Sequence, residues 1–315
     1  MRAATYSRGM QQPYQPRRTA RSTFLPIRGL NYHVHQWGDA SLVTPERPPL
    51  VMVHGWMDVG ASFQFAVDAL AAHEGFDRWV IAPDWRGFGR TEAPGVDTYW
   101  LPDYLGDLDG LLDALVPQGQ IDLLGHSLGG NVVMGYAGLR PARIRKLVNL
   151  EGFGLPQTQP HQSPKRLLTW LDELKTPALL RDYDSVQAVA ARLMSNNPLL
   201  AADKAAWLAP HWSRLMPDGR WHIQGDPAHK RSNPALYQVA EVLETWKRIT
   251  APLLWAEGDQ TDISKWWGTR YSIAEFHTRV AVVPQVEKVV LSPCGHMLHH
   301  DQPEALAGHI AQFLA

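Results

Sequence analysis

The sequence repeatedly alternates short apolar runs with amphipathic stretches, and this alternation constrains the fold more than any other feature. Six runs of four or five residues have the length and composition of buried strands, at 50–53, 79–82, 121–124, 146–150, 252–255 and 287–291. Helical patterns follow several of them, at about 62–73, 102–115 and 128–138, and another lies near 303–314. Strands alternating with helices predict an α/β fold with a mostly parallel sheet covered on both faces.

One long interval breaks this rhythm and suggests an insertion. Residues 155–247 contain no clear buried strand, but they hold helical stretches and five of the 13 tryptophans. Because a structureless loop of this length is unusual in a compact domain, we expect a helical cap here. The α/β core is then made of 22–154, which opens with a β-hairpin turning at Gly29, and of 248–315.

Residues 1–21 lack the apolar side chains needed to fold and are expected to form a flexible tail. The first 38 residues carry six arginines and no acidic residue, a bias that organelle transit peptides share. The sequence leaves such a targeting role open, but it has neither a secretory apolar core at its start nor a run of 18 apolar residues. We therefore expect a cytoplasmic protein without stable membrane insertion.

Composition narrows the classes of partner. Lys and Arg number 30 and Asp and Glu 31, so the net charge of −1 does not favour binding to nucleic acid. The single cysteine, Cys294, excludes an internal disulfide and paired-cysteine zinc motifs. No motif implies a metal or an organic cofactor. The expected partner is a small-molecule substrate, and the sequence leaves a homodimer open.

The motif that carries the chemistry is Gly-His-Ser-Leu-Gly at Gly125–Gly129. It follows an apolar strand and precedes the helical pattern at 128–138, which is the context in which G-x-S-x-G forms a sharp turn. Such a turn presents the serine hydroxyl at the carboxyl edge of the sheet, above the N-terminus of a helix. The sequence therefore predicts Ser127 as a nucleophile.

A serine nucleophile needs a base and an acid that orients this base. His296 stands in a loop after the last predicted strand, at the same sheet edge as Ser127, and is the expected base. Asp259, at the carboxyl end of the strand that includes the run at 252–255, is the expected acid. Glu151, which ends the strand at 146–150, and Asp262 are the alternatives.

An acyl-transfer reaction also creates an oxyanion that needs preorganised donors. We expect these donors to be the backbone N–H groups of Leu128, next to the nucleophile, and of Trp56, in the loop after the strand at 50–53. Four further residues near the nucleophile and this loop are expected to line the substrate pocket: His54, Gly55, Asp58 and His126.

These segments resemble those of the α/β-hydrolase superfamily. The resemblance lies in His54-Gly55-Trp56 (oxyanion loop), Asp84–Thr91 (D-x-R-G-x-G-x-S/T), Gly125–Gly129 (nucleophile turn) and Gly295-His296 with Pro303-Glu304. It implies eight strands, a cap after the sixth and a Ser-Asp-His triad. The chain is also similar to the carboxylesterase and serine hydrolase-like branch, although Ala256 stands where the family often has glycine.

The resemblance also implies a reaction class. Epoxide hydrolases and haloalkane dehalogenases of this fold attack with an aspartate where this chain has Ser127. We therefore expect hydrolysis of carboxylic esters through an acyl-enzyme, with an apolar or aromatic acyl or alcohol group because the cap is rich in tryptophan. The alternatives are a carbon-carbon bond hydrolase of ring-fission diketones with the same triad, and a non-catalytic ligand-binding protein.

Overall fold

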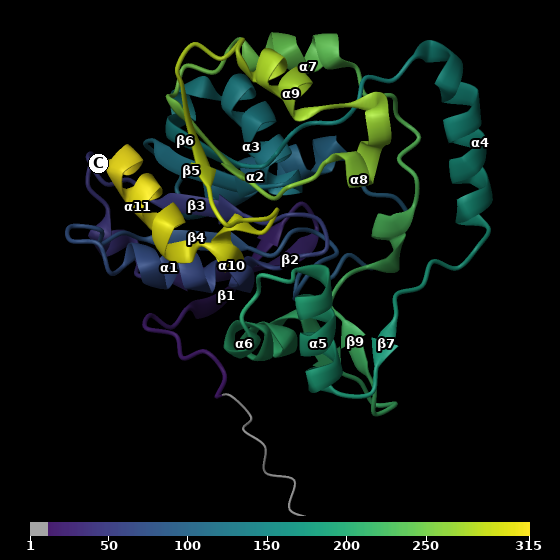
Figure 1. Ribbon diagram of the computed structural model, residues 1–315, viewed down its shortest axis with the longest axis horizontal. Coiled ribbons are helices and arrows are strands. Elements are labelled where there is room, and N and C mark those ends of the chain that lie inside the picture. The colour runs from purple at the N-terminus through teal and green to yellow at the C-terminus, as the bar shows by residue number, and fades with distance from the viewer. Residues whose placement is uncertain (1–11) are drawn as a thin grey trace, which may run out of the picture.

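The computed structural model describes residues 12–315, and its centre is one eight-stranded sheet (Figure 1). The strands lie in the order β1 (Arg21–Ile27), β2 (Leu30–Trp37), β4 (Val80–Pro83), β3 (Leu50–Val53), β5 (Ile121–His126), β6 (Ile144–Leu150), β10 (Leu253–Gly258) and β11 (Val286–Leu291). β2 is antiparallel to β1 and to β4, and the remaining pairs are parallel. This confirms the predicted α/β class and the opening hairpin.

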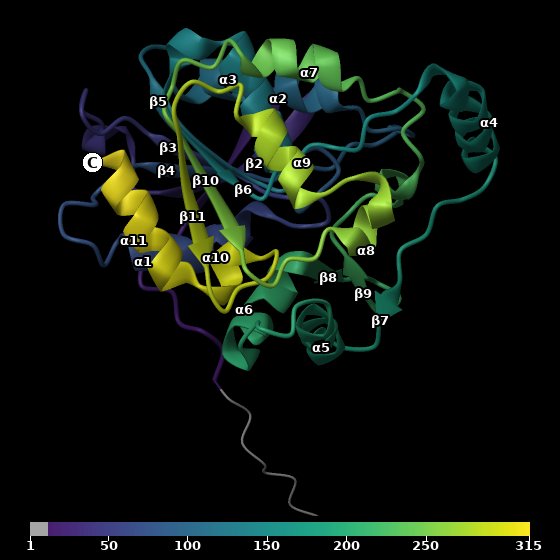
Figure 2. The same cartoon turned by 45° about the horizontal axis from the view of Figure 1, so that its top comes forward.

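Helices cover both faces of the sheet, as predicted (Figures 1 and 2). One apolar core contains residues of α1 (Gln64–Leu70) and α11 (Pro303–Leu314). The core on the other face contains residues of α2 (Leu101–Leu115), α3 (Leu128–Leu139), α7 (Val239–Trp246) and α9 (Ile273–Val280). Among residues 12–315, no helix combines the length and the apolar character needed to cross a bilayer.

Shorter helices connect these elements. They are η1 (Ala40–Leu42), η2 (Gly60–Phe63), η3 (Pro141–Arg143), η4 (Pro160–Gln162), η5 (Pro227–Lys230), α8 (Ser264–Trp267), η6 (Gly268–Arg270) and α10 (Leu298–Asp301). Two of them frame the sheet edge that carries the motifs, because η2 follows the loop after β3 and α10 follows the loop after β11.

The segment expected to be a helical cap holds α4 (Ser163–Leu174), α5 (Val186–Asn196) and α6 (Ala202–Trp212). It also holds a small antiparallel sheet that we did not predict, in the order β7 (Asp182–Tyr183), β9 (Trp221–Ile223) and β8 (Ser213–Leu215). Strands of two or three residues are too short to produce an alternating pattern. Among residues 12–315, α5 and α6 share an apolar cluster to which the main body contributes Phe65 and, at its margin, Tyr14. α7 instead packs on α3 through the buried Trp246.

The described part of the N-terminal segment is anchored, contrary to the expected flexible tail. The hydroxyl of Tyr14 donates to Asp68 Oδ2 over 2.9 Å, and the backbone N–H groups of Arg17 and Arg18 donate to the same carboxylate over 2.9 and 2.8 Å. The Tyr14 ring also lies edge-on to Phe65, with centroids 4.8 Å apart. A single buried carboxylate thus holds residues that have little apolar surface. Residues 1–11 of the predicted tail lie outside the described residues.

Buried histidines are expected to make the stability depend on pH. Burial lowers the pKa of His35 to about 4 and that of His229 to about 3, whereas an unfolded chain has histidine pKa values of about 6.5. Below about pH 6.5 the unfolded chain therefore binds protons that the folded chain does not. The free energy of unfolding should fall as the pH falls from about 6.5 towards 4, by up to about 1.4 kcal/mol per pH unit for each group.

Urea unfolding at pH 7 and pH 5 measures this loss. His229→Asn should reduce the difference between the two pH values, because one of the histidines with a lowered pKa is removed. His161→Gln, at an exposed position, is the matched control and should leave the difference unchanged. An equal pH dependence in wild type and His229→Asn would contradict the assignment.

Candidate active site

Ser127 occupies a strained turn between β5 and α3. Its backbone angles are φ 53° and ψ −114°, a region that residues other than glycine rarely adopt. Its N–H donates to Leu150 O over 2.9 Å, and its own carbonyl accepts from Asn131 N over 3.0 Å. The turn is therefore held from both sides, by the end of β6 and by the first turn of α3.

Glycines let three segments of backbone meet around this serine. A Cβ added to Gly129 would lie 2.7 Å from His54 O, and one added to Gly130 would lie 2.8 Å from Gly152 Cα. A Cβ on Gly55 would lie 3.1 Å from Ser127 Cβ, so the loop after β3 passes directly beside the nucleophile. Larger residues at these positions would push the segments apart.

His296 is hydrogen-bonded to Glu151, with 2.6 Å between Nδ1 and Oε2. Glu151 directly follows β6, is almost completely buried and has a positive φ of 52°. Its Oε1 accepts from Gly258 N over 2.7 Å, and its Oε2 also accepts from Thr261 Oγ1 over 3.0 Å. Each carboxylate oxygen thus has a donor that fixes it toward the histidine.

The prediction of Asp259 as the orienting acid needs correction. The carboxylate of Asp259 accepts from Ser292 Oγ over 2.6 Å and from Cys294 N over 2.9 Å, at the base of the histidine loop. These bonds lower the pKa of Asp259 below its ordinary value, and among residues 12–315 no hydrogen bond or ion pair joins this carboxylate to His296. The other alternative, Asp262, caps the turn at Ser264. Glu151, which we named as an alternative, is the acid that contacts His296.

The histidine loop is also held by the residue before the nucleophile. His126 Nε2 lies 2.8 Å from His296 O, and the two rings have centroids 4.8 Å apart. Burial and the charges of His299 and His296 hold the pKa of His126 well below its ordinary value, so it donates as a neutral imidazole. No hydrogen bond joins Ser127 Oγ to His296 among the described residues; such catalytic bonds often form only with substrate in place.

The expected oxyanion donors lie on two different segments next to Ser127. Leu128 begins α3, and Trp56 follows Gly55 beside the nucleophile. Within residues 12–315, neither backbone N–H has a hydrogen-bond acceptor. The indole of Trp56 is 52% exposed and donates through Nε1 to His229 O over 3.3 Å, which connects this loop to the cap.

Three of the side chains that we expected to line the pocket are instead packed inside the molecule. His54 is fully buried, and its Nε2 accepts from Trp85 N over 2.9 Å. Asp58 is buried and accepts from Ser62 Oγ and from the cap indole of Trp212, over 2.7 and 2.9 Å. His126 is buried as well. These three side chains therefore belong to the packed frame of the site.

Two groups among the described residues could hold a metal ion, and the sequence analysis missed both. They are His33, His35 and Asp84, and Asp58, His299 and His300. Each group joins residues from distant parts of the chain, so no local motif indicated it. The available signal was the His-x-His spacing on β2, which puts two imidazoles on one face of a strand.

Known proteins resemble the chain over most of its length. A family model described as alpha/beta hydrolase fold matches residues 48–303. A cis-3-alkyl-4-alkyloxetan-2-one decarboxylase of Shewanella oneidensis is 27% identical over 84% of this chain and 81% of its own. A 3-hydroxybutyrate-oligomer hydrolase of Cupriavidus necator is also 27% identical, over 80% and 83%.

A solved structure supports the same conclusion. The thioesterase domain from the curacin biosynthetic pathway superposes with a TM-score of 0.79 at 25% identity, covering 93% of this chain and 99% of that domain. The family match spans more than half of the chain, and the fold and the strained serine turn agree with it. The chain therefore belongs to the alpha/beta hydrolase fold family.

Proposed function

We propose that the chain hydrolyses carboxylic esters through an acyl-enzyme on Ser127. The observation that carries the proposal is the strained serine turn, combined with the 2.6 Å bond between His296 and Glu151 at the same sheet edge. A strained backbone costs free energy and persists where the surrounding structure imposes it, often at sites of function. A binding protein without catalysis would need neither the strain nor the paired imidazole.

In the proposed mechanism, Ser127 Oγ attacks the ester carbonyl while His296 takes its proton. Glu151 holds the imidazole with Nδ1 protonated and stabilises the imidazolium that forms. The N–H groups of Trp56 and Leu128 donate to the oxyanion. His296 then gives the proton to the leaving alcohol. In the second half of the reaction, water attacks the acyl-enzyme while His296 takes its proton, and this proton returns to Ser127 Oγ as the acid leaves.

The surroundings favour an apolar or aromatic group on the substrate. The Trp266 indole is 45% exposed and lies edge-on to His296, with centroids 4.6 Å apart. Trp56, half-exposed, follows the glycine that contacts Ser127. One exposed indole beside His296 and another in the loop that passes Ser127 offer apolar contact to an acyl or alcohol chain. The names of two similar proteins, an oligomer hydrolase and a thioesterase domain, are consistent with acyl transfer.

Hydrolysis of p-nitrophenyl esters, from acetate to long acyl chains, tests the proposed reaction. Wild type should release p-nitrophenol in a burst equal to about one equivalent of enzyme, followed by slower turnover, because deacylation follows acylation. Ser127→Ala should lose both the burst and the turnover. A folded wild type that hydrolyses none of these esters would contradict the proposal and favour the carbon-carbon hydrolase, testable with a ring-fission diketone.

The acid assignment predicts unequal effects of two isosteric variants. Glu151→Gln should lower kcat by about 10³ to 10⁴, because an amide cannot stabilise the imidazolium and favours the wrong tautomer. Asp259→Asn, which changes a carboxylate that contacts the loop but not the imidazole, is the matched control and should stay near wild type. The reverse order of effects would restore Asp259 as the acid.

The close approach of the loop after β3 predicts a second effect. Gly55→Ala places a methyl group 3.1 Å from Ser127 Cβ and 2.9 Å from His126 Nδ1, so the loop must move and carry Trp56 N–H with it. Displacement of a donor by about 1 Å can cost on the order of 100-fold in kcat. Gly135→Ala, in α3 with its nearest contact at 3.4 Å, is the control. Equal kcat in both variants would argue against Trp56 as a donor.

A further inference from the structure

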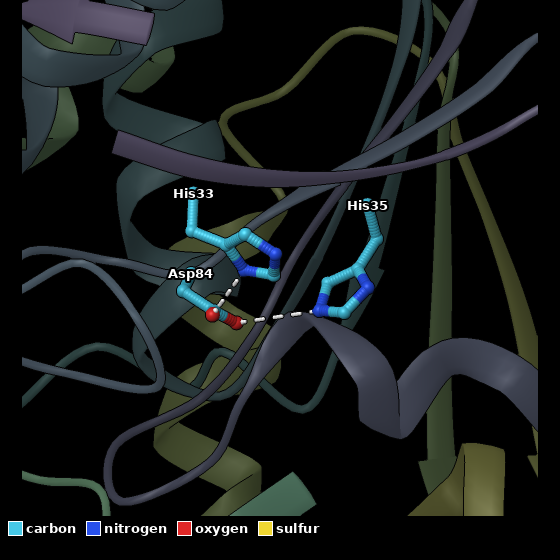
Figure 3. A group of neighbouring side chains, drawn as sticks. All are labelled: His33, His35 and Asp84. Carbon is cyan, nitrogen blue, oxygen red and sulfur yellow. Dashed lines mark hydrogen bonds and ion pairs between the residues drawn. The ribbon is translucent and has the colours of Figure 1, made fainter. Parts of the chain in front are cut away.

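His33, His35 and Asp84 form a compact group on the sheet, outside the proposed active site. His33 and His35 stand two residues apart on β2 and therefore share one face of the strand. Asp84 directly follows the antiparallel neighbour β4, and its N–H donates to His33 O over 3.0 Å. Figure 3 shows both imidazoles directed at the carboxylate, and one donor atom of each residue lies within 4.8 Å of the others.

The distances within the group are close to those of a metal site. His33 Nδ1 lies 2.7 Å from Asp84 Oδ2, and His35 Nε2 lies 3.9 Å from Asp84 Oδ1. Tetrahedral zinc with bonds of 2.0–2.2 Å separates its ligands by about 3.4 Å. The first separation is thus shorter than this value, and the second is longer.

His35 differs from the other two residues because its ring has no hydrogen-bond partner among the described residues. Its side chain is only 12% exposed, and its Nε2 faces Asp84 Oδ1 over 3.9 Å.

We propose that His33 Nδ1, His35 Nε2 and Asp84 Oδ1 form a binding site for a divalent first-row transition metal ion, with Zn²⁺ as the probe. Two imidazoles and a carboxylate are a ligand set typical of such ions, and water completes the coordination. The backbone N–H groups of Gly60 and Arg90 donate to Asp84 Oδ1 and Oδ2 over 2.7 and 2.9 Å, which fixes the orientation of the carboxylate.

Ser22 supplies the second contact that a ligating histidine needs. Without metal, His33 Nδ1–H donates to Asp84, and His33 Nε2, 2.5 Å from Ser22 Oγ, accepts from that hydroxyl. On metal binding, Nδ1 loses its proton and Nε2 gains one, so the ring stays neutral and Nε2–H donates to Ser22 Oγ. Arg90 Nη1, 3.4 Å from His33 Nε2, opposes the cation. We therefore expect weaker binding than at a closed structural zinc site.

Titration of the metal-free protein with Co²⁺, followed by its visible absorption, and competition with Zn²⁺ test the site. One ion should bind per chain. His35→Gln should weaken this binding at least about tenfold through loss of a ligand, and Ser22→Ala about tenfold through loss of the contact to His33. His222→Gln is the matched control, because His222 is exposed and lies beside Asp182 and Asp218. Unchanged affinity in His35→Gln, or a loss confined to His222→Gln, would overturn the proposal.

A second measurement does not depend on the folding of a variant. Wild-type crystals soaked in Zn²⁺ should give an anomalous peak at the zinc edge between His33, His35 and Asp84. A peak only elsewhere, or none, would overturn the site. Both readouts are independent of ester hydrolysis, so failure of the proposed activity would leave this test unaffected.

Discussion

The backbone packing around Ser127 is the constraint on which the rest of the site depends. The serine can hold its positive φ because the end of β6 accepts from its N–H and α3 begins immediately after it. Glycines at 55, 129 and 130 allow the loop after β3, the serine turn and the segment after β6 to meet without side chains between them. We therefore expect a change in any of these segments to move Ser127, the expected oxyanion donors and Glu151 together.

The sheet order places the partners of Ser127. β5, β6, β10 and β11 are successive neighbours, so the loops after them meet at one edge. Glu151 follows β6, directly beside the strand that carries the nucleophile, and reaches His296 across the loop after β10 by adopting a positive φ. Asp259 lies in that intermediate loop and holds the cis-proline segment at 292–294, from which the histidine loop continues. The two acids thus have different contacts, because Glu151 bonds the imidazole and Asp259 bonds the segment before it.

Buried imidazoles connect the site to the rest of the fold. Burial lowers the pKa of His54, His126 and His300, so that these rings pack as neutral groups near the nucleophile. Hydrogen bonds from Trp212 to Asp58 and from Trp56 to His229 connect the loop after β3 to the cap at two points. The position of the cap and that of the expected oxyanion donor are therefore mechanically coupled. Burial lowers the pKa of His211 in α6, and the charge of Asp84 opposes this shift, so this carboxylate also lies within electrostatic reach of the cap segment.

The sequence by itself determined the α/β class, the opening hairpin, the helices on both faces and the serine turn, because each follows from periodicity or from a motif within a few residues. It did not reveal the small sheet of the cap, the anchoring of Tyr14 on Asp68, or the two histidine and aspartate groups. These depend on contacts between distant segments. The choice between Asp259 and Glu151 was decided only by tertiary structure, because both follow strands that end at the same edge. Which carboxylate reaches His296 depends on the path of the loops there, and no local pattern encodes that path.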